Sequence, residues 1–386
     1  MPDSLDAATL PPSGDPMPWE RDDLLPEKPA NSDYGYFIGK KSHPCTQEEL
    51  VARCESKDVR EVTLVWHPKA SRVVPAAEVE FLFESLKKRK LNSQKTSISI
   101  TIFYIGFWCF MLLTMGERRQ NWYTLLLTVF GIIPLCENWI ALRKLKQSNW
   151  EDATGERGQT RFGIWVSRQR APWSGKFLGL ILLIAGGQAY VGMDRSIAMA
   201  GLVKEAVWRG EWWRSLTGTL LHAHPLHLVL NALSLFYVGK VIEALSSRYH
   251  LALIFIFSAL LGSIFSLFLL DVTSVGASGG IMGYIGFLLI MGLRQQTIMP
   301  KNYARSLAIA IIILAATGIV GVDFIDNAGH LGGLVGGLLI GMILIPKRSA
   351  SLPLKPSTSI RVVGLISLTL LIICACGILK LFFFRS

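Results

Sequence analysis

The feature that most constrains this 386-residue chain is a series of long apolar runs separated by polar connections. Each run is about 16 to 24 residues long, the length that a helix needs to cross a bilayer core of roughly 30 Å. Hydrophobic residues make up 51% of the chain and charged residues only 17%, which is more apolar than an ordinary soluble domain. The sequence therefore predicts an all-α polytopic membrane protein.

Nine of these runs are predicted to form membrane helices. They cover residues 96–115, 121–143, 175–193, 224–246, 249–270, 278–293, 304–321, 329–346 and 360–383.

Lysine and arginine gather on one side of this topology. They occur as "KKRK" at 87–90, through the linker at 143–170, and after the sixth and eighth helices. The positive-inside rule then places the N-terminus in the cytoplasm. Two segments put arginine on the other side: the short 116–120, and the aromatic 194–223, which we expect to lie in the membrane interface.

The net charge of +11 follows from this topology. No basic patch with interleaved aromatics appears, so we expect no nucleic-acid partner. The six cysteines show neither zinc nor disulfide spacing, and we expect no metal and no cofactor. The first 30 residues lack the pattern of a signal or transit peptide, which favours a bacterial plasma membrane.

Two soluble segments precede the membrane helices. Residues 1–33 are rich in Pro, Asp and Ser and are predicted to be disordered. Residues 34–90 carry strand-like stretches, "GYFIG" and "REVTLVWHP", and helix-like stretches, "TQEELVARC" and "PAAEVEFLFESLKKRK". Thr46 with Glu49 has the spacing of a capping box. We predict a small α+β domain here and a basic cytoplasmic linker at 144–174.

Residues 34–85 resemble a GYF-like domain. The similar positions are Tyr36, Phe37 and Gly39, followed by "TQEEL", "LVW" and "VPAAEV". The resemblance implies a domain that binds a proline-rich peptide or protein. A cytosolic regulatory or spacer domain without such a ligand is the alternative.

The stretch "TSVGASGGIMG" at 273–283 places Ser278 among glycines between apolar runs. About 16 apolar residues from Ser278 to Arg294 make a helix of roughly 24 Å, shorter than the bilayer core. Ser278 should therefore lie in a depression below the outer surface. Irregular backbone at that depth needs a water-filled cavity, and the helix start favours a developing anion.

Histidines and glycines surround this position in the predicted topology. His227 and Asn231 are four residues apart and share one helical face, which indicates a common target. Gly329, Gly333 and Gly337 form a small-residue face matched by Gly279 and Gly283. Close packing of the two faces would bring His330 to Ser278 as base to nucleophile.

Residues 175–346 resemble the rhomboid family of intramembrane serine proteases, whose six-helix core would carry two extra N-terminal helices and one C-terminal helix here. The motifs are Trp213-Arg214, His222, His227 with Asn231, Glu243, Gly276-x-Ser278-Gly279, and His330 with Gly333 and Gly337.

The resemblance implies a Ser278–His330 dyad that cleaves transmembrane or membrane-proximal segments of membrane proteins near the extracytoplasmic face. It implies an oxyanion site made by His227, Asn231 and the amide of Ser278. The remaining motif residues would have structural roles. Many bacterial members carry a tyrosine four residues after the serine, where this chain has Met282.

Three alternatives remain at this point. One alternative is a protein that only binds or escorts membrane helices, although that class usually lacks the serine or the histidine. A transporter should show an internal repeat and midplane charges, which we do not find. A triad with Asp326 is disfavoured because we expect Asp326 in an exposed polar turn.

Overall fold

The computed structural model describes residues 17–21, 25–56, 58–114, 120–321, 325–347 and 352–384. Within these residues eight helices are long and apolar enough to cross a membrane, and a ninth apolar helix has 17 residues. Each predicted span falls on one of these nine helices. The prediction of a polytopic helical membrane protein is therefore confirmed. The segment 115–119, which carries most of the short connection at 116–120, lies outside the described residues.

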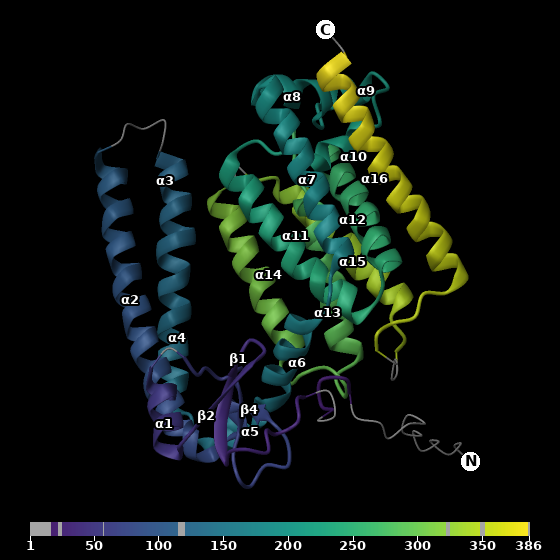
Figure 1. Ribbon diagram of the computed structural model, residues 1–386. Coiled ribbons are helices and arrows are strands. Elements are labelled where there is room, and N and C mark those ends of the chain that lie inside the picture. The colour runs from purple at the N-terminus through teal and green to yellow at the C-terminus, as the bar shows by residue number, and fades with distance from the viewer. Residues whose placement is uncertain are drawn as a thin grey trace, which may run out of the picture.

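A two-helix hairpin stands beside a bundle of seven helices (Figure 1). The hairpin consists of α2 (Phe83–Thr114) and a second span made of α3 (Gln120–Leu127), the π-helical turn η5 (Thr128–Ile132) and α4 (Ile133–Gln147). The bundle consists of α7 (Pro172–Val191), α11 (Pro225–Leu245), α12 (Arg248–Leu269), α13 (Ser278–Arg294), α14 (Tyr303–Val320), α15 (Asn327–Leu344) and α16 (Thr358–Phe384).

The N-terminal domain is a small α+β unit, as predicted. Its antiparallel sheet has the order β2-β1-β3-β4 and packs with one helix. Its elements are β1 (Tyr34–Ile38), β2 (Lys41–Cys45), α1 (Gln47–Glu55), β3 (Leu64–Trp66), β4 (Val74–Pro75) and two 3₁₀ turns, η2 (Ala76–Glu78) and η3 (Glu80–Leu82).

Local sequence signals explain the start of this domain. Thr46 caps α1: its hydroxyl accepts from the Glu49 amide at 3.2 Å, and the Glu49 carboxylate accepts from the Thr46 amide at 3.0 Å. The predicted capping box is thus confirmed. Strand β2 was not predicted. It follows β1 across a tight turn in which Gly39 has φ +60°, a conformation that favours glycine.

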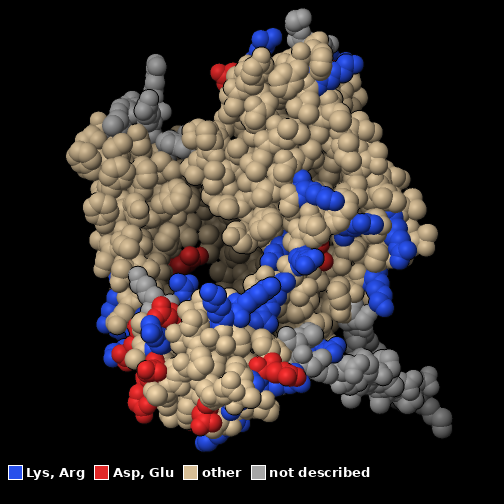
Figure 2. All heavy atoms as spheres, in the orientation of Figure 1, with Lys and Arg blue, Asp and Glu red and all other residues tan. Residues whose placement is uncertain are grey.

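The domain is held against the segment that leads into the bundle. This segment contains α5 (Trp150–Gly155) and α6 (Arg157–Arg168), so the basic linker predicted at 144–174 is largely helical. Arg161 makes a two-pronged ion pair with the Glu78 carboxylate at 2.6 and 2.7 Å, and both side chains are mostly buried. Figure 2 shows that Lys and Arg gather toward this end of the molecule.

Part of the segment predicted to be disordered is ordered. Trp19 is 5% exposed and packs on Phe162 and Trp165, with ring centroids 5.0 and 5.3 Å away. The prediction for 1–33 therefore fails at residues 17–21 and 25–33. Local composition could not predict this order, because it depends on aromatic rings of α6 that are distant in the sequence. Residues 1–16 and 22–24 lie outside the described part of the chain.

The connection between α7 and α11 caps the far end of the bundle from the N-terminal domain (Figure 1). It contains α8 (Met193–Ala200), α9 (Lys204–Trp208), α10 (Arg214–Thr217) and the 3₁₀ turn η6 (Gly218–Leu220). Trp208, Trp212 and Trp213 on this connection are exposed. Tryptophans of this kind are frequent where a membrane meets water.

Candidate active site

Ser278 is the first residue of α13, and the backbone before it is held by the α8–α10 connection. Leu202 and Ser274 exchange two backbone hydrogen bonds of 3.0 and 3.3 Å, and the amide of Gly276 donates to the carbonyl of Gly218 at 3.0 Å. Gly276 has φ +130°, a conformation that side chains other than glycine rarely adopt. The chain thus approaches α13 along a fixed path.

The neighbours of Ser278 show how deep it lies. A Cβ on Gly279 would contact Ala259 and Gly262 of α12, at 3.8 and 3.9 Å from their Cα atoms. Gly262 lies about two helical turns, roughly 10 Å, before α12 ends at Leu269. Ser278 therefore lies well below the end of a neighbouring span, in keeping with the 17 residues of α13.

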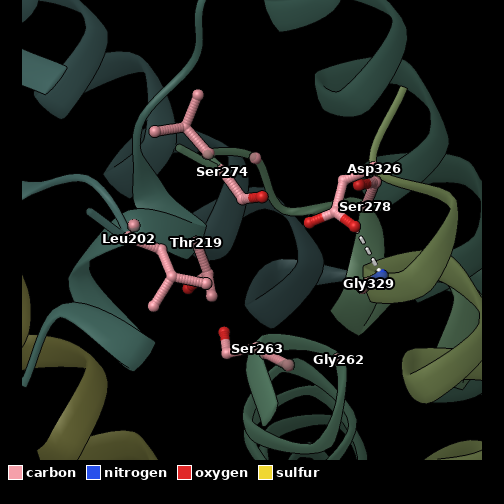
Figure 3. A pocket seen from close by; sticks show the side chains of 13 residues that line it. Leu202, Thr219, Gly262, Ser263, Ser274, Ser278, Asp326 and Gly329 are labelled. Atoms are coloured by element: carbon pink, nitrogen blue, oxygen red, sulfur yellow. Dashed lines mark hydrogen bonds between the residues drawn. The ribbon is translucent and has the colours of Figure 1, made fainter. Parts of the chain in front are cut away.

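A small cavity of about 40 Å³ opens beside Ser278 (Figure 3). A water molecule needs roughly 10–15 Å³ of such space, so the cavity can hold a few waters if polar groups bind them. Four polar side chains line it together with Ser278: Thr219, Ser263, Ser274 and Asp326. The cavity can therefore admit water to a point inside an otherwise apolar bundle.

Helices α13 and α15 touch backbone to backbone along their glycines. A Cβ added to Gly333 would collide with the carbonyl of Gly279, and one added to Gly337 would collide with the carbonyl of Gly283. The small-residue faces expected from the sequence thus face each other. A Cβ on Gly279 would also lie 3.5 Å from the carbonyl oxygen of Gly329. The residues that adjoin Ser278 and His330 in the chain are consequently in contact.

His330 lies in the first turn of α15, and Asp326 caps this helix. The Asp326 carboxylate accepts from the amide of Gly329 at 2.6 Å, and its carbonyl accepts from the amide of His330 at 3.0 Å. Asp326 is half-buried and lines the cavity, so the expected exposed turn is wrong. Among the hydrogen bonds of the described residues, none joins Ser278 to His330. Such bonds are often long before substrate binds.

His227 lies on the other side of Ser278. A Cβ on Gly276 would lie 2.9 Å from His227 Nε2 and 3.8 Å from Ser278 Oγ, so the imidazole and the hydroxyl both lie close to Gly276. Asn231 is 6% exposed and donates one amide hydrogen to the carbonyl of His227 at 3.0 Å. Its second N–H is left for another acceptor.

His222 is 1% exposed, and its ring meets that of His227 edge to face at 5.2 Å. Burial, and secondarily the charge of His227, lower the pKa of His222 to about 3, which keeps it neutral. Gln188 holds its backbone from α7, accepting from the His222 amide at 2.9 Å and donating to its carbonyl at 3.2 Å. Gln188 was not predicted as a site residue, although one glutamine in an apolar run is a signal of function or support.

The remaining motif residues bond to the segments around the site and at the far end of the bundle. Arg214 is 7% exposed, pairs with Glu211 at 2.7 Å, and donates to the carbonyls of Ala198 and Gly201. Its guanidinium lies 4.9 Å from the ring centre of Trp213. At the other end of the bundle, Glu243 accepts from the amides of the first turn of α7, those of Trp173 and Ser174.

Met282, at the position where the resemblance to rhomboid proteases leads us to expect a tyrosine, is 7% exposed. Tyr284 does not take its place, since it is fully buried and donates to the carbonyl of Leu251 at the start of α12. Ser278 lines the same cavity as Gly262, which lies far along α12 from Leu251. The hydroxyl of Tyr284 therefore serves helix packing at the other end of the bundle.

The fold and this site together define a polytopic membrane protein with a polar cavity at a helix start inside the bundle. The family model for the rhomboid domain matches residues 209–347. YdcA of Bacillus subtilis, described as a putative rhomboid protease, is 32% identical over 145 residues, 36% of this chain and 70% of YdcA. The chain belongs to the rhomboid family.

Two other relatives match a smaller share of their own length. Rhomboid protease GluP of Bacillus subtilis is 30% identical over 213 residues, 55% of this chain and 40% of GluP. RHOMBOID-like protein 4 of Arabidopsis thaliana is 34% identical over 149 residues, 38% of each chain. The chain thus spans less than half of both proteins. The family match leaves residues 34–90 uncovered, so it lends no support to the GYF-like resemblance.

Proposed function

We propose that this protein is a serine endopeptidase that cleaves membrane proteins within or beside their transmembrane segments. The observation that carries the proposal is the cavity beside Ser278, at the start of a short helix that packs backbone to backbone against the helix carrying His330. A hydrolase inside a membrane needs both a nucleophile and water at that depth.

In this proposal Ser278 Oγ attacks the scissile carbonyl carbon while His330 accepts the hydroxyl proton. The tetrahedral intermediate then breaks its C–N bond, and the imidazolium returns the proton to the leaving amine. A water molecule attacks the resulting acyl ester with His330 again as base, which releases a carboxylate and restores Ser278. No cofactor or metal takes part.

The negative charge on the intermediate needs donors that point at it in advance. We assign these to the amide of Ser278, the imidazole of His227 and the free amide hydrogen of Asn231. The closeness of His227 to Gly276 and Ser278 supports this assignment, as does the internal bond that orients Asn231. The start of α13 adds the favourable end of the helix dipole.

We assign supporting roles to the other motif residues. His222 packs on His227, Arg214 with Trp213 stiffens the connection above the site, and Glu243 caps α7. Gly279, Gly333 and Gly337 allow the close approach of α13 and α15, and Gly276 provides the turn.

The substrate class follows from the position of the site. A peptide bond is reachable only where its helix unwinds, so we propose substrates with a transmembrane segment that is locally unstable and has a small residue at the cut. We place the site near the extracytoplasmic face of a bacterial plasma membrane, with the N-terminus in the cytoplasm. The bundle at 175–346 would be the protease core, with 96–143 and 360–383 as additions.

We propose that residues 34–90 form an adaptor for a proline-rich peptide or protein. Deletion of residues 1–90 should then change either cleavage or the set of co-purifying proteins. The adaptor hypothesis fails if both are unchanged.

The decisive test of the protease is Ser278→Ala and His330→Ala with a model single-span substrate in proteoliposomes. Each variant should lose at least about a thousandfold in cleavage rate, and His227→Ala or Asn231→Ala should lose about 10²–10³-fold. Ser263→Ala is the matched control, because Ser263 lines the same cavity but donates to the carbonyl of Ser215. Cleavage at the wild-type rate by both dyad variants would reject the proposal.

The alternative is a catalytically silent rhomboid-like protein that binds or escorts membrane helices. The presence of both Ser278 and His330 favours the protease. A serine-directed mechanism-based probe separates the two, since failure to label Ser278 in the folded wild-type protein would support the alternative.

A further inference from the structure

A buried lysine lies behind the proposed active site and takes no part in the mechanism above. Lys204 begins α9 and is only 5% exposed, although a lysine is almost never this deeply buried without a partner. Its ammonium donates to the hydroxyl of Ser266 in α12 at 2.6 Å. Among the described residues no carboxylate lies within ion-pair distance of this ammonium, and its hydrogen-bond partner is the Ser266 hydroxyl.

The hydrogen bond from Lys204 continues toward Ser278. The hydroxyls of Ser266 and Ser274 lie 2.8 Å apart, and both residues are buried. An ammonium can only donate, so Ser266 must accept from it. The hydroxyl hydrogen of Ser266 is then best satisfied by Ser274, which gives the chain of bonds one direction.

Ser274 connects this chain to the cavity. It lines the cavity with Ser278, and Figure 3 shows its side chain next to the segment that runs into α13. Its backbone is paired with Leu202, two residues before Lys204, and Gly276 is bonded to Gly218. Ser274 is therefore held by its backbone on one side and by its hydroxyl on the other.

We propose that Lys204 is a positioning residue for Ser278, acting through Ser266 and Ser274. Because Lys204 donates to Ser266, it orients the Ser266 hydroxyl to donate to Ser274, and this second bond ties the side chain of Ser274 to α12. The tie holds the backbone at 274–276 in place and thereby aims the amide of Ser278 at the oxyanion. The proposal rests on the proposed protease function. A positioning role of this kind should change the stabilisation of the transition state, and hence kcat, and have little effect on substrate binding.

The pH dependence of cleavage can distinguish a role of the Lys204 charge from a role in packing alone. Burial lowers the pKa of the Lys204 ammonium, and the charges of Asp326 at the start of α15 and Asp271 after α12 oppose that effect. Lys204 should thus lose its proton at a lower pH than an exposed lysine. Cleavage by the wild type should fall on the alkaline side as the ammonium is lost.

The main experiment measures kcat and KM against pH for Lys204→Met and Lys204→Arg in proteoliposomes. We expect Lys204→Met to lower kcat about 10- to 100-fold with KM within about twofold, and to lack the alkaline fall. Lys204→Arg keeps a charged donor and should recover part of kcat, with the alkaline fall moved to higher pH. Lys240→Met is the control, because Lys240 also donates to one oxygen, the carbonyl of Ser167, at 2.7 Å but lies far from Ser278.

A double variant tests the chain of bonds itself. If Lys204 acts through Ser274, Lys204→Met with Ser274→Ala should be no slower than the slower single variant. Additive losses would overturn the proposal, as would a wild-type kcat or an unchanged alkaline fall in Lys204→Met. If Lys204→Met does not fold, Ser274→Ala and the pH profile of Lys204→Arg decide the same question.

Hydrogen exchange keeps this proposal separate from the protease assignment. Amides at 274–276 should exchange faster in Lys204→Met than in wild type or Lys240→Met, whatever reaction the site performs. Unchanged exchange there would reject the positioning role. Unchanged cleavage by Ser278→Ala would instead reject the protease.

Discussion

Two neighbouring parts of the bundle are packed in opposite ways. Helices α13 and α15 bury most of their inner faces and touch through glycine backbones. Helix α14, which connects them in the chain, has a single buried residue, Gly318, and exposes large side chains such as Ile312 and Ile319. Helices α13 and α15 therefore form a rigid pair, whereas α14 is held loosely beside them.

This difference fits the proposed chemistry. Ser278 and His330 come from two helices, so their separation depends on how firmly those helices are locked together. A neighbouring helix with few buried contacts is able to move at a much lower free-energy cost. Tight packing is thus concentrated in the two helices that carry Ser278 and His330, whereas α14 carries neither residue.

The largest expected effect is at the glycine contact. Gly337→Ala would place a Cβ against the carbonyl of Gly283 and push α15 away from α13. We expect a loss of stability of several kcal/mol, in the upper range of single substitutions, together with loss of cleavage. The loss of stability is measured by thermal unfolding in detergent. Gly377→Ala in α16 is the control, because a Cβ there meets no atom within 4 Å, and it should unfold like the wild type.

The next effect compares the same substitution in the two regions. Ile281 in α13 is 5% exposed, whereas Ile312 in α14 is 67% exposed. Ile281→Ala should lower the free energy of unfolding by about 2–5 kcal/mol, because it leaves a cavity. Ile312→Ala should change it by less than about 0.5 kcal/mol. Equal losses in the two variants would show that α14 is packed as tightly as α13.

The smallest effect concerns the C-terminal end of α14. The side-chain amide of Asn327 donates to the carbonyl of Gly318 at 2.8 Å and ties α14 to the start of α15. Asn327→Ala should cost about 1 kcal/mol and raise amide hydrogen exchange in 303–320 but not in 278–294. Faster exchange in both segments would mean that the two regions open together.

The sequence predicted the membrane spans well and the soluble parts less completely. Runs of apolar residues are a local signal, since the bilayer thickness sets their length. The helices α5 and α6, strand β2 and the ordered position of Trp19 were missed or wrongly assigned. Each of them depends on a contact with a distant segment, such as Arg161 with Glu78 or Trp19 with Phe162.

The sequence by itself determined that this chain is a helical membrane protein, and that Ser278 stands at the start of a short apolar helix. It also placed glycines where α13 and α15 meet. Only the tertiary structure decided that Asp326 caps α15, that Gln188 holds His222, and that Lys204 reaches Ser274 through Ser266. Spacing along one helix defines a face, but partners from different helices meet only after those helices have packed.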